Sequence, residues 1–137
     1  MRTNFEDITF ELTAEEAQYA KIISEKICQN IGKSNAVTST RIIAFFAKKE
    51  IKLNPGRLRK IIQYIRISGM VENLVGCSKG YYVAANSEEA AASVLSLREQ
   101  IRSIQATAES LLSQGLKKFG QDFVVKQMEL AKKISQQ

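Results

Sequence analysis

The stretch from Asn54 to Gly69 constrains the fold more than any other part of this 137-residue chain. Asn54 is a favoured residue type at a helix N-cap, and Pro55 suits the first helical position because its missing N–H is not needed there. Gly69 is a natural helix terminator. Between these ends, apolar residues recur at i, i+3, i+4 and i+7, which predicts a helix with one buried stripe. The stripe consists of Leu58, Ile61, Ile62 and Ile65.

An earlier helix is predicted over Ala14–Ile31. Thr13 and Glu16 fit a capping box, in which each side chain satisfies a free backbone N–H of the other residue, and Gly32 is expected to end the helix. Before this helix, apolar residues alternate with polar ones over residues 8–12, which indicates a short strand or an extended arm.

A second helix follows, with Thr38 or Ser39 as its N-cap. Just before it, Val37 is expected to pair briefly as a strand residue. After the helix that ends at Gly69, the segments Met70–Val75 and Gly80–Ala84 are typical of two strands of a hairpin, joined by a connector with a glycine at each end. One of the two tyrosines of the second strand is expected to point inward, because side chains alternate along a strand.

The region after Asn86 carries one long helical pattern. Its apolar residues are spaced alternately three and four residues apart, which is the heptad seam of a coiled coil. The seam consists of Val94, Leu97, Ile101, Ile104, Ala108 and Leu111. β-Branched residues at one seam position and mostly leucine at the other favour a parallel homodimer. The same seam also suits a helix pair within one chain.

Gly115 and Gly120 bracket a short segment at which the long helix is expected to break. A last amphipathic helix is predicted from Gln121 to Ile134. It either folds back on the long helix or docks on a partner chain, so a protein partner for this terminal helix is one of the expectations.

The positive charge of the chain concentrates in its first 85 residues. The chain has 20 Lys and Arg against 14 Asp and Glu, a net charge of +6. Residues 1–85 hold 13 basic and 8 acidic residues, a net charge of +5. Residues 86–137 hold 7 basic and 6 acidic residues, a net charge of +1. An excess that gathers around Arg41–Arg66 predicts a polyanionic partner.

Catalysis is not expected from this chain. It has no histidine, which removes the commonest general base, the commonest metal ligand and every histidine-containing triad. Cys28 and Cys77 have no second metal ligand nearby in sequence, so no metal, cofactor or disulfide framework is expected. No phosphate-cradling glycine loop occurs, and no apolar run approaches the roughly 18 residues of a membrane span. We therefore expect a non-enzymatic cytoplasmic protein.

The outward face of the Asn54–Gly69 helix carries side chains of the types that read DNA in the major groove. Arginine pairs with guanine and glutamine with adenine in the major groove, and a small residue permits close approach. The expected base-reading residues are Gly56, Arg59, Lys60 and Gln63. Cations, hydroxyls and helix N-termini bind phosphate. The expected contacts to the DNA backbone are Ser39, Thr40, Arg41, Lys49, Arg57, Tyr64 and Lys79.

Each of these signals also has a simpler interpretation. A basic helix face is by default a solvated face, and a glycine-flanked hairpin is often only a hairpin. The order of the parts favours DNA: a short helix, a basic helix and a two-stranded hairpin follow one another directly.

The run from Ile31 to Gln105 resembles the small winged-helix proteins of phages and prophages. The similar segments are NAVTST before the second helix, IIQYIRISG at the end of the third, and CSKGYYVAAN in the hairpin, followed by a long helix with regularly spaced apolar residues. The resemblance implies a winged helix-turn-helix fold that binds duplex DNA in a sequence-directed way, in transcription control or phage replication. It also implies that Arg57, Arg59, Lys60 and Gln63 face the groove. The AKKEIKLNPG link is longer and more basic than a tight turn, and the tail beyond Leu111 lies outside the resemblance.

The expected protein is therefore mainly α, of the α+β class. Residues 1–85 form a winged-helix domain with a two-stranded wing, and residues 86–137 form a helical region, one long helix and one shorter, that makes a homodimer. The expected location is the cytoplasm or nucleoid of a bacterial host. Two other functions stay open, namely a protein-binding module that inhibits or adapts a host protein, and a factor that organises or segregates DNA.

Overall fold

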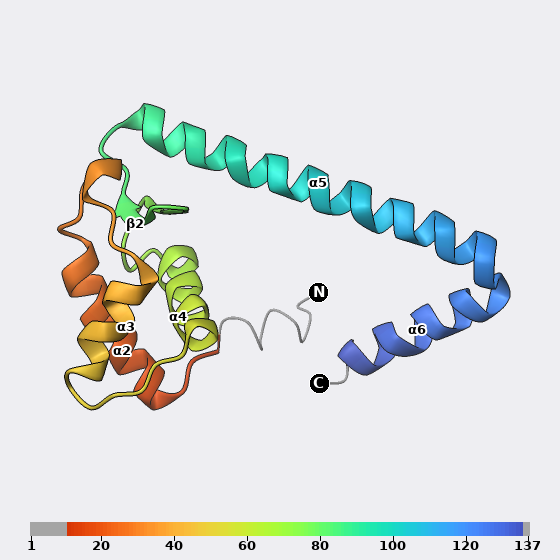
Figure 1. The fold of residues 1–137 in the computed structure, drawn as a ribbon, viewed down its shortest axis with the longest axis horizontal. Helices are drawn as coiled ribbons and strands as arrows, with labels where there is room; N and C mark the ends of the chain where they lie inside the picture. Colours follow the sequence, from red (N-terminus) through yellow and green to blue (C-terminus); the bar gives the residue numbers. More distant parts are fainter. Residues whose placement is uncertain (1–10, 136–137) are drawn as a thin grey trace. The chain divides into compact units, whose positions relative to one another are not determined.

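A computed structural model describes residues 11–135 of the chain, which fall into two units that meet between Ser93 and Val94. The elements in chain order are α2 (Ala14–Ile27), a short 3-10 helix η1 (Lys33–Asn35), α3 (Ser39–Ala47), α4 (Pro55–Ser68), β1 (Leu74–Cys77), β2 (Gly80–Val83), α5 (Ser87–Phe119) and α6 (Gln121–Ser135). The structure is thus mainly helical with one small antiparallel sheet, as expected for the coarse fold class (Figure 1). Of the arm or strand predicted over residues 8–12, residues 8–10 lie outside the described residues, and Glu11 and Leu12 belong to no helix or strand.

Helices α2 and α3 both pack against α4, and their apolar faces form one core in the first unit. The predicted stripe of α4 is buried in full, as are Ile23 and Ile27 of α2 and Phe46 of α3. The connector between α3 and α4 contributes too, because Leu53 is buried in the same core.

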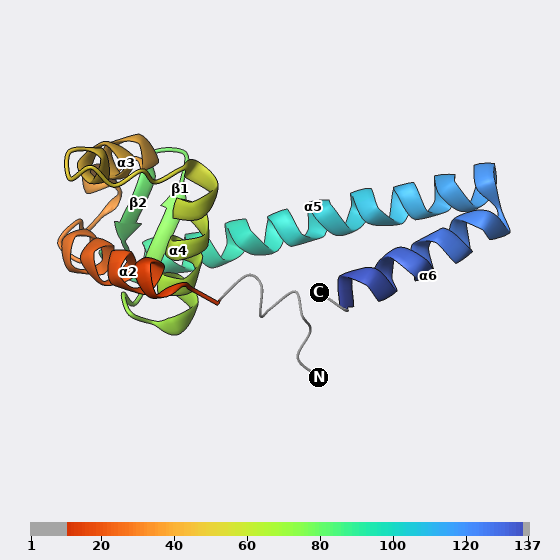
Figure 2. The same ribbon diagram turned by 90° about the horizontal axis from the view of Figure 1, so that it is seen from below.

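The hairpin of β1 and β2 is tied to the connector between α2 and α3. Within the hairpin, Cys77 pairs with Gly80, so the turn between the strands has only two residues (Figure 2). Val37 exchanges two backbone hydrogen bonds with Tyr81, at 2.9 and 2.8 Å, which confirms the predicted strand pairing of Val37. The N–H of Gly32 donates to the carbonyl of Val83 at 2.8 Å.

The ends of the first helix and of the first strand differ from expectation. Helix α2 ends at Ile27 instead of Ile31, because the residues that follow turn toward β2, where the carbonyl of Asn30 accepts a hydrogen bond from the N–H of Val83. Strand β1 begins at Leu74 instead of Met70. The start of β1 is set by its pairing with β2. The place of β2 depends in turn on long-range contacts, which local sequence periodicity does not report.

The first turns of α5 belong to the first unit, which runs to Ser93. Asn86 caps α5 by accepting a hydrogen bond from the N–H of Glu89. The carboxylate of Glu89 in turn accepts hydrogen bonds from the backbone N–H groups of Lys33 and Ala85, at 3.2 and 2.8 Å. These bonds fasten the first turn of α5 to the first unit.

In the second unit, α6 turns back along α5 as a helical hairpin (Figure 1). The predicted break of the long helix at Gly115 is wrong, because α5 continues through this residue to Phe119. The turn comes at Gly120, whose φ of 59° lies in the left-handed region that glycine adopts readily.

Candidate nucleic-acid interface

The local sequence of α4 sets which of its side chains point away from the core. The side chain of Asn54 caps the helix by accepting a hydrogen bond from the N–H of Arg57 at 2.7 Å, and Gly69 ends the helix with φ of 78°. With the apolar stripe turned inward, Gly56 and Arg59 are exposed, and Gln63 is half-buried. No hydrogen bond or ion pair involves Arg59 within the part of the chain that the structure describes.

Two other basic residues of α4 are engaged by an acid of α2. Nε of Arg57 donates to one carboxylate oxygen of Glu16 at 3.0 Å, and Nζ of Lys60 donates to the other oxygen at 3.0 Å. Arg57 also reaches Glu15 at 3.4 Å. The side chain of Glu16 is only 5% exposed, whereas the two cations are 29% and 32% exposed. Glu16 therefore binds the start of α2 to α4.

The ion pairs change the acidity of Glu16. Its burial would by itself raise the pKa, but hydrogen bonds from the backbone of Thr13 and from the side chains of Lys60 and Arg57 outweigh burial and lower the pKa from 4.5 to about 2. The same hydrogen bond to Glu16 raises the pKa of Arg57. The cluster is thus charged on both sides at neutral pH.

Two residues that are expected to contact DNA take part in this cluster. Lys60 is expected to read bases, and its ammonium group lies beside the buried carboxylate of Glu16. Arg57 is expected to contact the DNA backbone, and it forms an ion pair with the same acid. Of the other expected base-reading residues, Arg59 and Gln63 make no side-chain hydrogen bond or ion pair within residues 11–135, and Gly56 has no side chain.

The predicted backbone contacts at the start of α3 lie close to the hairpin. Thr38 is the N-cap, since its hydroxyl accepts from the N–H of Arg41 at 3.2 Å. Thr40 and Arg41 are exposed, and Ser39 is half-buried. Gly80 packs directly on the backbone of Val37 and Thr38, so the exposed Lys79 at the hairpin tip sits next to the first turn of α3.

Lys49 lies at a different place. Its ammonium group stands 4.8 Å from the ring centroid of Phe45, and Lys26 of α2 stands 4.2 Å from the same centroid. These contacts border a pocket of about 240 Å³ between α2 and α3. Among residues 11–135, its walls are apolar apart from Asn30, Lys26 and Arg41, and none of these lining residues is acidic.

Tyr64 is half-buried on α4. Its neighbour Arg66 holds the hairpin, because its Nε donates to the carbonyl of Leu74 at 3.1 Å. Of the two hairpin tyrosines, Tyr82 is buried and Tyr81 is half-buried, which confirms that one of them points inward. Burial raises the pKa of Tyr82.

Sequence reasoning missed the role of Glu16, although the sequence contains the signal. Glu16 precedes Ala20, Ile23 and Ile27 by 4, 7 and 11 residues, so it continues the buried stripe of α2. An acid on a buried stripe needs a cation, and only the packed structure identifies which cations approach it. No pattern in the sequence indicates the pocket between α2 and α3, because the pocket depends on how the two helices pack.

The seam residues predicted for dimerisation are exposed in the single chain. Val94, Leu97, Ile101, Ile104 and Leu111 are 41–69% exposed. Ala108 is exposed as well.

Comparisons with family models, curated proteins and solved structures found no match to this chain. Over residues 11–135, no helix is both long and apolar enough to cross a membrane. The same residues contain no group of three or more acidic or cysteine side chains placed to hold a metal ion.

Proposed function

We propose that this chain is a non-enzymatic, sequence-directed binder of duplex DNA with a winged-helix domain, acting as a phage or prophage transcription regulator or replication-associated factor. In this proposal α4 is the recognition helix and the β1–β2 hairpin is the wing. The observation that carries the proposal joins two features of the first unit. The capped helix α4 has an exposed arginine, Arg59, that makes no hydrogen bond or ion pair within residues 11–135, and the hairpin with Lys79 at its tip packs on the first turn of α3.

The ion pairs of α4 refine the roles within this proposal. Arg59 and Gln63 read base edges and Gly56 permits close approach of the helix. The main role of Arg57 and Lys60 is to orient α4 through their ion pairs with Glu16. Contact of their exposed atoms with backbone phosphate is a secondary role. Thr40, Arg41 and Lys79 contact phosphates beside the recognition helix.

The chain would act as a homodimer through the seam that begins at Val94, presenting two recognition helices to a site with two-fold symmetry. Each phosphate contact releases counterions, so affinity falls steeply as salt rises.

Selection of bound sequences from a random duplex pool, followed by anisotropy titration on the selected site, tests this function. Arg59→Ala is expected to weaken specific binding by roughly 1–3 kcal/mol and to relax the preference at one base position. Arg102→Ala on the exposed surface of α5 removes the same charge and is expected to have a much smaller effect. Equal losses in the two variants would remove Arg59 from base reading.

A second candidate function is favoured by the pocket between α2 and α3. Its apolar walls suit an acidic protein segment with a large apolar side chain, because the lining residues that the structure describes include Lys26 and Arg41 and no acid. Absence of DNA affinity at about 50 mM salt, together with saturable binding of such a peptide, would favour this protein-binding module. Cooperative coating of repeated DNA sites would instead indicate a DNA-organising or segregation factor.

A further inference from the structure

The apolar stripe of α5 continues beyond the predicted seam. One more step of four residues leads from Leu111 to Gly115, where the ring of Phe123 from α6 packs so closely that a β-carbon on Gly115 would overlap it. The face of α5 that carries the stripe is therefore the face that α6 turns toward.

The contact between Gly115 and Phe123 sets a register in which the two helices could pair. In an antiparallel helix pair, each step forward on one helix is a step back on the other. Extended from Phe123 opposite Gly115, this register sets Leu130 against Ala108 and Ile134 against Ile104. In the first two of these three pairs a large residue meets a small one, which is how facing helices interdigitate.

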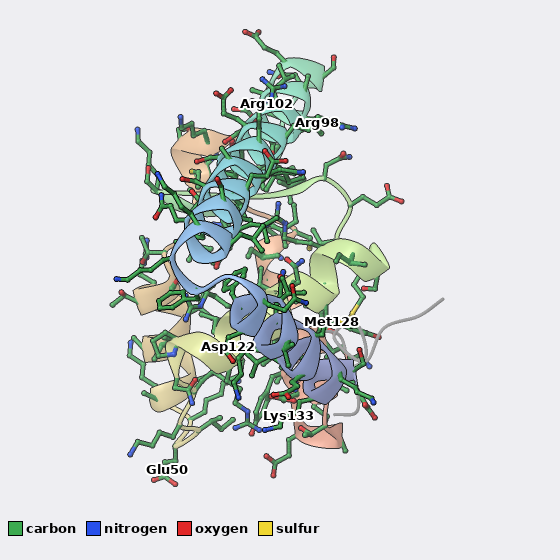
Figure 3. All side chains as sticks on the ribbon, turned by 90° about the vertical axis from the view of Figure 1, so that its right-hand side faces the viewer. Glu50, Arg98, Arg102, Asp122, Met128 and Lys133 are labelled. Carbon is green, nitrogen blue, oxygen red and sulfur yellow. The ribbon has the colours of Figure 1, made fainter. Side chains whose placement is uncertain are left out.

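This pairing cannot cover the whole stripe. Helix α5 has 33 residues and α6 has 15, so α6 ends opposite about residue 104 even when it lies fully against α5. Val94, Leu97 and Ile101 are beyond its reach. The two helices also diverge from their turn (Figure 1), and Leu130 and Ile134 are more than half exposed, as is Met128, labelled in Figure 3.

The charges beside the stripe fit a second copy of the same chain. In a coiled coil, the residues that flank the seam decide which partners are accepted. Here the flanking positions are Ser93, Arg98, Gln100, Gln105, Thr107, Leu112 and Gln114. Only one of these side chains is charged, so identical seams meet without extensive like-charge repulsion, and nothing on the flanks selects a foreign helix by charge.

We propose that two α5–α6 hairpins from two copies of this chain form one four-helix bundle, in which α6 supplies core side chains. The proposal deepens the homodimer of the proposed function and does not depend on DNA binding. Leu130 and Ile134 of the last helix enter the bundle core, while the part of the stripe from Val94 to Ile101 packs on the second copy.

Sedimentation equilibrium of the full chain and its variants tests the bundle. The unmutated chain is expected to be a dimer. Leu130→Ala with Ile134→Ala keeps helix propensity but truncates the α6 face, and it should raise the dimer dissociation constant about tenfold or more. Leu97→Ala with Ile101→Ala, which truncates the α5 stripe, should also raise the dimer dissociation constant about tenfold or more. Glu129→Ala with Lys132→Ala, which truncates two side chains on the side of α6 roughly opposite Leu130 and Ile134, should leave the constant unchanged.

A monomeric unmutated chain, or a larger assembly, would overturn the proposal. So would an unchanged dissociation constant in the Leu130→Ala, Ile134→Ala variant, since α6 would then lie outside the interface. Helical circular dichroism of each variant at high concentration separates loss of association from loss of folding. A dimer that fails to bind DNA would overturn the proposed function and leave the bundle standing.

Discussion

The carboxylate of Glu16 holds the start of α2 to the basic helix α4. One of its oxygens accepts from both the Thr13 N–H and the Lys60 ammonium group, each at 3.0 Å, and the other accepts from Arg57. Cations that would otherwise be counted as a DNA-binding surface are therefore partly structural. The capping box was predictable from the spacing of Thr13 and Glu16, and the structure confirms it. The ion pairs join residues 41 and 44 positions apart, which no local pattern reports.

Replacing Glu16 with glutamine should lower the free energy of unfolding by roughly 1–3 kcal/mol at neutral pH, because two partly buried cations lose their counter-charge. The amide can still cap α2. Urea denaturation followed by circular dichroism measures the change. Glu15→Gln is the matched control: its side chain is 72% exposed, so the loss should be under about 0.5 kcal/mol. Equal losses would contradict the structural role of Glu16.

The depressed pKa of Glu16 predicts how stability depends on pH. A carboxylate whose pKa is lower in the folded than in the unfolded state stabilises the fold above the unfolded pKa, and this contribution is lost as the pH falls through the folded value. For Glu16 the loss should occur between pH 4.5 and about 2. Unfolding titrations of the unmutated chain and of Glu16→Gln across this range should converge as the pH falls. Parallel curves would show that Glu16 has an ordinary pKa.

At the level of elements, the bounds predicted from the sequence were most accurate where local interactions determine the structure. The bounds of α4 follow from an N-cap, a proline and a terminal glycine, and the structure confirms them. The hairpin was predicted in kind, but β1 lies several residues later, because its register is set by β2. Strand β2 is in turn fixed by Val37, which is distant in sequence. Helix α5 continues through Gly115, and the ring of Phe123 that packs on this glycine comes from the next helix, which the pattern of α5 does not report.

Two glycines with left-handed φ angles give a matched test of the hairpin contact. Gly80 has φ of 115° and a β-carbon there would overlap the carbonyl of Val37, whereas Gly69 has φ of 78° and open space around it. Gly69→Ala should lower the free energy of unfolding by roughly 1 kcal/mol, from backbone strain alone. Gly80→Ala should lower it by at least about 2 kcal/mol, because the strand must also move away from Val37. Denaturation midpoints measure both, and equal losses would contradict the close approach.

For the whole molecule, the two units differ in what stabilises them. The first unit has its own buried core. From Val94 onward, Gly115 is the one buried residue in the described part of the chain, so the apolar faces of α5 and α6 are exposed in the single chain. The heptad spacing predicted the apolar seam of α5 from sequence. It did not report the contact between Gly115 and Phe123.

Hydrogen exchange should therefore respond to protein concentration in one unit only. Amides of α5 beyond Val94 and of α6 should become more protected as concentration rises, because dimerisation stabilises these helices by mass action. Amides of α2 and α4 should be insensitive, since their protection comes from a core within one chain. Mass-spectrometric exchange on peptic peptides resolves the two regions. Concentration-independent protection throughout would contradict association through the second unit.

The pairing of Val37 with Tyr81 has a consequence for the order in which the chain folds. The partners are 44 residues apart, and a two-stranded hairpin as short as β1–β2 is not stable by itself in water. Closing so long a loop carries an entropic cost that is recovered only after the helices have collapsed. The helices should thus form first and the sheet last. The lysine-tipped hairpin is then the final piece acquired during folding and the first to open when the native state fluctuates.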